Sequence, residues 1–99
     1  MKLYVLVRND LSKSQQAVQA GHAVAEWVKS WWVEDESDWD NTLVYLRSTD
    51  IQADYDKFYK VDPIWIEPFF EPDLDYEMTA FAIPGDGDVP ELLKNYRLV

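Results

Sequence analysis

The chain has 99 residues, a hydrophobic content of 47%, a net charge of −10 and no cysteine. This length suffices for one hydrophobic core, so we expect a single domain over residues 1–99. The lack of cysteine excludes disulfides, thiolate metal sites and a cysteine nucleophile. No apolar run approaches the roughly 20 residues of a membrane span, and the first is too short for a secretion signal. We therefore expect a soluble, cytoplasmic protein without a membrane partner.

The charge is distributed unevenly along the chain. Residues 1–30 carry four basic and two acidic side chains, whereas residues 31–99 carry five basic and seventeen acidic ones. Proteins that bind a long stretch of nucleic acid usually neutralise several phosphates with clustered basic residues. The sequence has no such cluster, so we expect no extended nucleic-acid footprint. A single phosphate near Arg8 and Lys13 remains compatible with this distribution.

An apolar strand and a long helix open the chain. Residues 2–7, KLYVLV, form a nearly continuous apolar run, which is typical of a central strand buried on both faces. Ser12 or Ser14 is a good cap for a helix over residues 13–33. Two apolar stripes run along this helix and predict contact with the sheet and with a second neighbour. Gly21 lies in one stripe, where it costs about 1 kcal/mol in helix propensity, so we expect close packing there.

The remaining elements alternate between strands and helices. The pattern predicts strands over 43–47, 64–70 and 78–83, helices over 50–60 and 89–95, and a final extended piece over 96–99. Pro68 cannot donate to a strand ladder, so its strand is expected at a sheet edge or at a bulge. The order β-α-β-α-β-β-α predicts an α/β fold, a single-domain four-stranded mixed sheet with helices packed on it. If the first two strands are parallel, their crossover should be right-handed.

Aromatic residues are numerous, with five tryptophans and six tyrosines. One small sheet is not expected to bury Trp27, Trp31, Trp32 and Trp39 together. Exposed aromatic patches mark interfaces, so we expect a homodimer that forms through exposed aromatics.

Polar residues gather where the first strand ends and the helix begins. α/β sheets present their ligands at such corners, beside a helix N-terminus. Gln15, Gln19 and His22 follow at spacings of four and three, on one helix face. His22 is the only histidine, and two interpretations stay open: a hydrogen-bonded core residue or a functional side chain.

An acidic segment returns to this corner. Glu71, Asp73, Asp75 and Glu77 alternate, and in an extended segment their carboxylates would point the same way and repel. A solvated loop is the preferred interpretation. A hard-cation site and a general base beside the helix are the alternatives. There is no EF-hand spacing and no phosphate-binding glycine loop, so we expect no metal and no cofactor.

Two motifs match a known family pattern. Arg8-Asn9-Asp10-Leu11 ends the first strand, and Gln19-Ala20-Gly21-His22-Ala23 lies in the helix. With Thr79 at the start of the last apolar strand, they resemble the type II peptidyl-tRNA hydrolases. The match is good over residues 1–25, fair over 70–83 and topological between them. The resemblance implies the fold of that family and a related pocket.

The chain also departs from the family pattern. The family's helix lysine, four residues before the glutamine, is Gln15 here, and Lys13 is the candidate to replace it. The bend before the helix is shortened to Ser12-Lys13-Ser14, and the family's second loop threonine is missing. The loop is also shorter, so either Glu71 or Asp73 can take the place of the family's loop aspartate.

The resemblance implies two sets of site residues. The catalytic candidates are Gln19, His22, Asp73 and Thr79, and the ligand-binding candidates are Arg8, Asp10, Lys13, Gln15 and Glu71. The first hypothesis is an esterase that acts on peptidyl-tRNA or a related nucleotide-linked conjugate, with activity impaired by the missing lysine. Its partner would be the acceptor end of the tRNA. The alternative is a non-catalytic module, for example a virus-encoded or regulatory decoy, that holds or sequesters a small nucleotide-like ligand.

Overall fold

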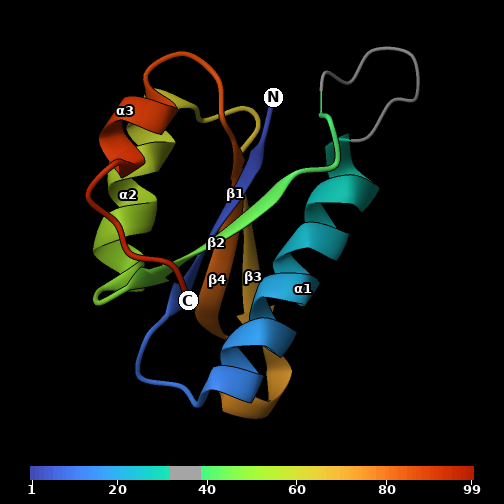
Figure 1. The fold of residues 1–99 in the computed structure, drawn as a ribbon. Coiled ribbons are helices and arrows are strands. Elements are labelled where there is room, and N and C mark those ends of the chain that lie inside the picture. The colour runs from blue at the N-terminus through green and yellow to red at the C-terminus, as the bar shows by residue number, and fades with distance from the viewer. Residues whose placement is uncertain (32–38) are drawn as a thin grey trace.

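A four-stranded mixed sheet organises the computed structural model, which describes residues 1–31 and 39–99. The strands are β1 (Leu3–Arg8), β2 (Leu43–Ser48), β3 (Glu67–Glu71) and β4 (Glu77–Pro84). The helices are α1 (Lys13–Trp31), α2 (Ile51–Val61) and α3 (Val89–Leu93), and a 3-10 turn (Pro72–Leu74) joins β3 to β4. The predicted α/β fold with helices packed on a mixed sheet is thereby confirmed (Figure 1).

β1 lies inside the sheet, whose strand order is β2-β1-β4-β3. It pairs in parallel with β2 and antiparallel with β4. Leu3, Val5, Leu6 and Val7 are all fully buried. Burial on both faces is the reason for the continuous apolar run in the sequence, because neither set of alternating side chains meets water.

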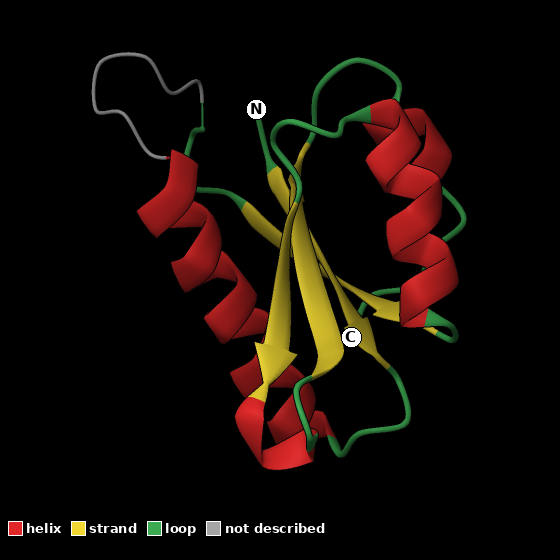
Figure 2. Ribbon diagram, turned by 180° about the vertical axis from the view of Figure 1, so that it is seen from behind, coloured by secondary structure: helices red, strands yellow, loops and turns green. Residues whose placement is uncertain are grey.

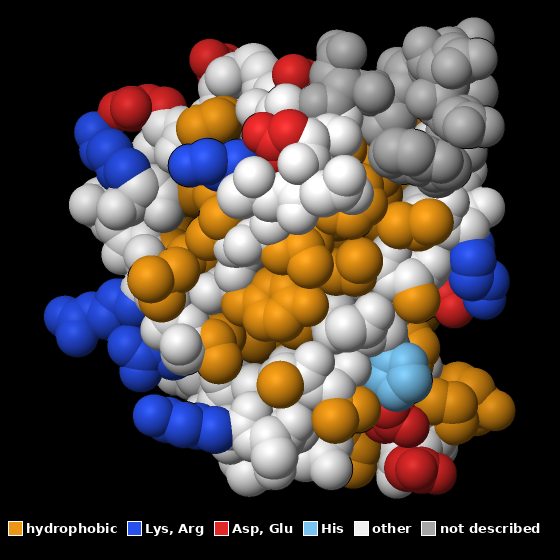
Figure 3. Space-filling view, turned by 45° about the vertical axis from the view of Figure 1, so that its right-hand side comes forward, with side chains coloured by type: hydrophobic (Ala, Val, Ile, Leu, Met, Phe, Trp, Pro, Cys, Tyr) orange, Lys and Arg blue, Asp and Glu red, His pale blue; other side chains and the backbone are white. Residues whose placement is uncertain are grey.

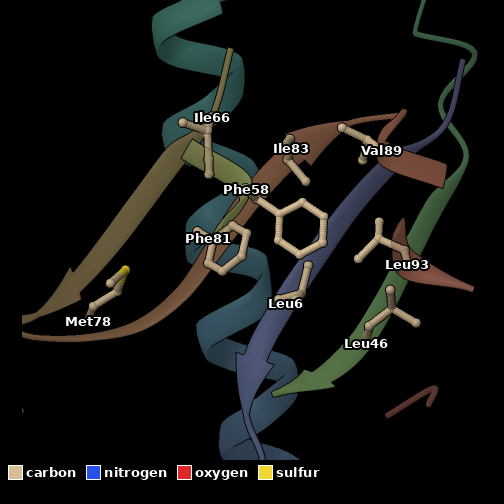
Figure 4. Close-up of a cluster of buried hydrophobic side chains, with 9 residues drawn as sticks. All are labelled: Leu6, Leu46, Phe58, Ile66, Met78, Phe81, Ile83, Val89 and Leu93. Atoms are coloured by element: carbon tan, nitrogen blue, oxygen red, sulfur yellow. The ribbon is translucent and has the colours of Figure 1, made fainter. Parts of the chain in front are cut away.

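The two faces of β1 belong to two different cores. Val5 and Val7 pack with Ala20, Ala23 and Trp27 beneath α1. The opposite core lies beneath α2 and α3 and is drawn in Figure 4; it contains Leu6, Leu46, Phe58, Ile66, Met78, Phe81, Ile83, Val89 and Leu93. Figure 2 shows the same arrangement from behind, with helices on both sides of the sheet.

The two parallel strands send their chains to opposite faces of the sheet. β1 leads into α1 on one face, and β2 leads into α2 on the other. The carboxyl ends of β1 and β2 therefore form a topological switch point, where ligands commonly bind in open α/β sheets. Asn9, just after β1, donates its backbone N–H to the carbonyl of Ser48 at 3.0 Å and ties the two ends together.

β3 is an edge strand with an irregular register. Pro68 lies within it, and the pairing with β4 shifts between Phe69 and Phe70. Pro68 is expected at a sheet edge or at a bulge, and it lies in an edge strand close to a bulge. The strand starts three residues later than predicted, because Trp65 lies in a turn where its backbone N–H donates to the Asp62 carboxylate at 3.1 Å.

Local caps define the starts of the two long helices. Ser12 caps α1, since its hydroxyl accepts from the backbone N–H of Gln15 at 3.2 Å. Asp50 caps α2 in the same way through the backbone N–H of Ala53 at 3.1 Å. The predicted final extended piece forms one antiparallel bridge, between Leu46 and Leu98.

α1 buries one apolar stripe and leaves the other exposed. Val18, Gly21 and Ala25 lie on the exposed side. A Cβ added to Gly21 would meet nothing within 4 Å, so the expectation of close packing there is wrong. The reason is geometric: a single helix on a sheet buries one face only, and in the described ranges no other element covers its outer side.

The tryptophans contribute to the core more than the sequence predicts. Trp27 is 1% exposed and donates its indole N–H to the carbonyl of Trp65 at 2.9 Å. Trp31 and Trp39 are half-buried, and Trp32 lies outside the described residues. Exposed large hydrophobic side chains are found elsewhere, including Ile64, Trp65, Phe70, Tyr76 and Leu98. The homodimer stays a prediction.

The described residues contain no candidate for a membrane-spanning helix. None of their helices combines the length and the apolar character that crossing a bilayer requires.

Phe58 is the aromatic residue of α2 that anchors the helix to the sheet. It is fully buried, whereas its neighbour Tyr59 is 48% exposed. We expect Phe58→Ala to lower the free energy of unfolding by about 3–5 kcal/mol, because the truncation leaves a cavity in the core. Urea unfolding followed by tryptophan fluorescence measures this change. Tyr59→Ala is the matched control, with an expected loss below about 1 kcal/mol; equal losses in the two variants would contradict the packing described.

Candidate functional site

Two hydrogen bonds between side chains form a chain that links β4, α1 and β3. The Thr79 hydroxyl donates to Gln19 Oε1 at 2.7 Å. Gln19 Nε2 in turn donates to Glu71 Oε2 at 2.9 Å. The other Glu71 oxygen accepts from the backbone N–H of Asp73 at 3.1 Å. Residues that are far apart in sequence, and that the family resemblance singled out, therefore meet between α1 and the edge of the sheet.

A bulge in β4 aims Thr79 at α1. Phe69 pairs with Ala80 and Phe70 pairs with Met78, so Thr79 is the extra residue between them. Met78 packs in the core beneath α2, whereas Ala80 packs in the core beneath α1. In a regular strand these two side chains would share one face. The bulge breaks the alternation and lets Thr79 reach Gln19 on the α1 side.

Gln19 is the middle member of the chain and is only 3% exposed. Its oxygen accepts from Thr79, and its nitrogen donates to Glu71 and, at 3.5 Å, to the side chain of Gln15. A buried amide needs such partners, because an unmade hydrogen bond away from water is costly. The amide is thereby held in one orientation, with its oxygen toward Thr79 and its nitrogen toward Glu71 and Gln15.

Glu71 is the acidic end of the chain and is half-buried. The backbone N–H of Asp73, the amide of Gln19 and the nearby His22 together hold the pKa of Glu71 below its usual range. The group is therefore a carboxylate at neutral pH. A carboxylate of low pKa can accept a hydrogen bond from water and stabilise positive charge, and it is a weak general base.

The structure distinguishes the two acidic candidates for the loop position. Glu71 contacts Gln19, whereas Asp73 is exposed and contributes its backbone N–H to Glu71. The segment is not extended, because it contains the 3-10 turn, and Asp75 and Tyr76 follow with φ of 53° and 60°. Among the described residues, no group of three His, Cys, Asp or Glu side chains could hold a metal ion. The hard-cation alternative therefore has no ligand set there.

His22 lies on the surface beside this chain. Its ring stacks on Phe69, with centroids 4.6 Å apart and planes at 15°. It is exposed, so the interpretation as a core histidine is wrong (pale blue in Figure 3). The exposed Gln15 lies one turn before Gln19 and accepts from its amide. His22, Gln15 and the Glu71 carboxylate are therefore the groups of this cluster that an incoming molecule could touch.

Arg8 lies on the face of the sheet opposite to α1 and the Thr79–Gln19–Glu71 chain. It is two residues after Leu6, so its side chain is on the same face of β1 as Leu6, and it lines a hollow with Ile51 of α2. Its guanidinium is bonded to Asp10 at 2.7 and 3.0 Å and to Glu77 at 2.8 Å. Hydrogen bonds to Asp10 and then Glu77 raise the pKa of Arg8, and the guanidinium lowers the pKa of Asp10. Arg8 thus ties β1 to β4, with both flanking carboxylates already engaged.

Lys13 points away from the Gln19 chain as well. It lines a cavity of about 560 Å³ with Asn9, Gln16 and Arg47, at the carboxyl ends of β1 and β2. Arg47 was missed by the sequence reasoning, although it stands at the end of the second predicted strand. The rule that ligands approach the carboxyl ends of parallel strands would have drawn attention to it.

No protein-family model matches the sequence, and no curated protein is significantly similar to it. The structure is an α/β domain with a mixed sheet and a Thr79–Gln19–Glu71 hydrogen-bond chain between α1 and the sheet. The roles of the site residues stay predictions.

The lowered pKa of Glu71 predicts a pH-dependent contribution to stability. A carboxylate whose pKa is depressed by folding stabilises the protein above its unfolded pKa, about 4.3, and loses that effect as pH falls through the folded pKa. We expect Glu71→Gln to unfold more easily than wild type at pH 7, with the difference shrinking below about pH 4. Urea unfolding between pH 3 and 7 measures it.

Asp73→Asn is the control for that measurement, since the Asp73 side chain makes no hydrogen bond with the described residues. A constant difference between Glu71→Gln and wild type at every pH would show that the Glu71 carboxylate does not gain its hydrogen bonds on folding.

Proposed function

We propose that the protein is an esterase of the type II peptidyl-tRNA hydrolase kind, with the fold of that family. The observation that carries the proposal is the Thr79–Gln19–Glu71 hydrogen-bond chain. Each member occupies a position that the family resemblance singles out, and the three lie on separate elements. A chance resemblance in sequence would give no reason for these side chains to meet.

The chemistry we infer is attack of water on the ester that joins a peptidyl group to a ribose. The Glu71 carboxylate accepts a hydrogen bond from the water and takes its proton as the water oxygen bonds to the carbonyl carbon. The bond from that carbon to the ribose oxygen then breaks, and the proton passes to the leaving hydroxyl. Gln19 and Thr79 act as positioning residues, because the amide orients the carboxylate and the hydroxyl orients the amide.

In the described part of the chain, the site lacks a cation that would stabilise the negative charge developing on the carbonyl oxygen in the transition state. The family's lysine position is Gln15, and Lys13 lines the cavity on the other side of the first helical turn. The groups within reach are the exposed His22 and Gln15 side chains. Removing one charge-stabilising donor costs about 10²–10³ in rate in other hydrolases, so we expect slow turnover.

The acceptor end of the tRNA is the partner we propose. Residues 31–99 carry seventeen acidic side chains against five basic ones. Such a surface repels the phosphates of an extended duplex. A short single-stranded end presents few phosphates and would reach the surface around Glu71 and His22 with less repulsion.

A non-catalytic binding module is the second candidate. The observation in its favour is that Thr79 is fully buried and Gln19 nearly so, with their hydrogen bonds already made. Such a network is complete as a structural link between α1 and the sheet. A protein of this kind would hold a nucleotide-like ligand, as a viral or regulatory decoy does, without turnover.

Hydrolysis of an N-blocked aminoacyl-tRNA tests the proposal. We expect measurable turnover by wild type, a loss of about 10²-fold in kcat/KM for Glu71→Gln and about tenfold for Thr79→Val, which removes the hydroxyl at constant shape. The pKa of Glu71 is lowered, so protonation of this carboxylate should cause no loss of activity between pH 8 and about pH 5. Circular dichroism confirms that the variants are folded.

Asp73→Asn is the matched control, because it removes an exposed carboxylate two residues from Glu71. It should retain wild-type activity. Loss of turnover in Asp73→Asn with full activity in Glu71→Gln would assign the acidic role to Asp73. The absence of turnover at high protein concentration would favour the binding module.

A further inference from the structure

A second polar region lies at the switch point between β1 and β2. Two cavities, of about 440 and 560 Å³, meet there, and both are lined by Asn9 and Arg47. Each has the size of a small-molecule site. The chain leaves β1 toward one face of the sheet and β2 toward the other, which leaves a crevice outside the carboxyl ends of the two strands. We call this region the switch-point crevice, defined by Asn9, Lys13, Gln16, Arg47 and Arg97.

Three cations line the crevice. Lys13, Arg47 and Arg97 are exposed, and among the described residues none of them forms an ion pair. Arg8 and Lys29, by contrast, are both paired with carboxylates. In a chain of net charge −10, three cations without an ion pair in the described part of the chain, around two adjoining cavities, favour an anion as the ligand.

On the face drawn in Figure 3, several basic side chains lie along the left edge, away from the histidine and its acidic neighbours. α1 also begins at Lys13, so the positive end of its dipole faces the crevice.

Gln16 supplies an independent sign of a ligand. It is only 5% exposed and lines the same cavity as Lys13 and Arg47. Its Nε2 donates to the carbonyl of Leu11 at 2.8 Å, which fixes the amide orientation. Its Oε1 is buried and accepts no hydrogen bond from the described residues. Buried acceptors without a donor are uncommon, and a ligand hydroxyl would satisfy this one.

The far wall of the crevice also accepts hydrogen bonds. Asp54 lines the smaller cavity beside Arg47 and Arg97. Its carboxylate is already held by the hydroxyls of Ser48 at 2.5 Å and Tyr96 at 2.6 Å. A ligand in the smaller cavity therefore meets the Asp54 carboxylate as well as Arg47 and Arg97, and a ligand hydroxyl can donate to that carboxylate.

We propose that the switch-point crevice binds a ribose phosphate. The phosphate lies against Lys13, Arg47 and Arg97, and a ribose hydroxyl donates to Gln16 Oε1. The ligand is either a free ribonucleotide or the 5′-phosphorylated end of an RNA strand, which share this chemistry. The site is separate from the Glu71 carboxylate and does not depend on the esterase proposal, since Gln16 and Gln19 face different groups.

Titration of the labelled protein with AMP, followed by amide chemical shifts, tests the proposal. We expect shifts at Asn9, Gln16 and Arg47, and weaker binding of inorganic phosphate, which lacks the ribose donor. Arg47→Gln should weaken AMP binding about tenfold, because it removes a charged hydrogen bond to phosphate. Lys29→Gln, which makes the same change of charge at the far end of α1, should stay within about twofold of wild type.

Gln16→Met tests the contributions of the ribose and the phosphate to the affinity separately. It removes the acceptor, so AMP affinity should fall to that of inorganic phosphate while phosphate binding stays at the wild-type level. Glu71→Gln should bind AMP as wild type does, which keeps this test independent of the esterase site. A 5′-phosphorylated trinucleotide that binds more tightly than AMP would identify an RNA end as the ligand, and the reverse order a free nucleotide.

Three outcomes would overturn the proposal. The first is the absence of shifts at the crevice with millimolar AMP. The second is an equal loss of affinity in Arg47→Gln and Lys29→Gln, which would reflect net charge alone. The third is equal affinity for AMP and inorganic phosphate, which would show that the ribose does not contribute to binding.

Discussion

Burial of β1 on both faces is the constraint from which the rest of the structure follows. A strand with apolar side chains on both sides must be covered on both sides. α1 covers one face, and α2 and α3 cover the other. β1 leads into α1 on one face and its parallel neighbour β2 leads into α2 on the other, so a crevice lies outside their carboxyl ends. The switch-point crevice is thus a consequence of how the core is closed.

The same packing places polar groups where water is excluded. Gln16 and Gln19 both turn inward from the first half of α1. Gln19 is satisfied by Thr79 and Glu71, and this is possible only because the bulge in β4 turns Thr79 toward the helix. Gln16 is satisfied on its nitrogen and not on its oxygen. One helical turn therefore separates a closed hydrogen-bond network from an open one.

Charge pairing divides the corner into regions with different chemistry. Arg8 is neutralised by Asp10 and Glu77 and serves to hold β1 against β4. Glu71 is a carboxylate stabilised by N–H donors. Lys13 and Arg47 have no such partners among the described residues and lie on the other side of the first turn of α1. An acidic chain can thus present one locally basic surface without a basic composition.

The sequence by itself determined the features that depend on local periodicity. The apolar run of β1, the serine cap of α1, the edge position of Pro68 and the order of strands and helices all follow from neighbouring residues. The spacing of Gln15, Gln19 and His22 is local as well, because it places the three residues on one helix face. These patterns are local, because helix and strand periods repeat within a few residues.

Only the tertiary structure decided which of those polar residues meet. Arg8 and Lys13 are five positions apart, yet strand alternation and the turn into α1 direct them to different sides. Glu71 rather than Asp73 faces Gln19, because the 3-10 turn carries the chain away after Glu71. A one-residue bulge decides where Thr79 points, and such an insertion reverses the side-chain alternation without any mark in the sequence. Contacts between distant elements depend on register, and register is set by the packing of the whole domain.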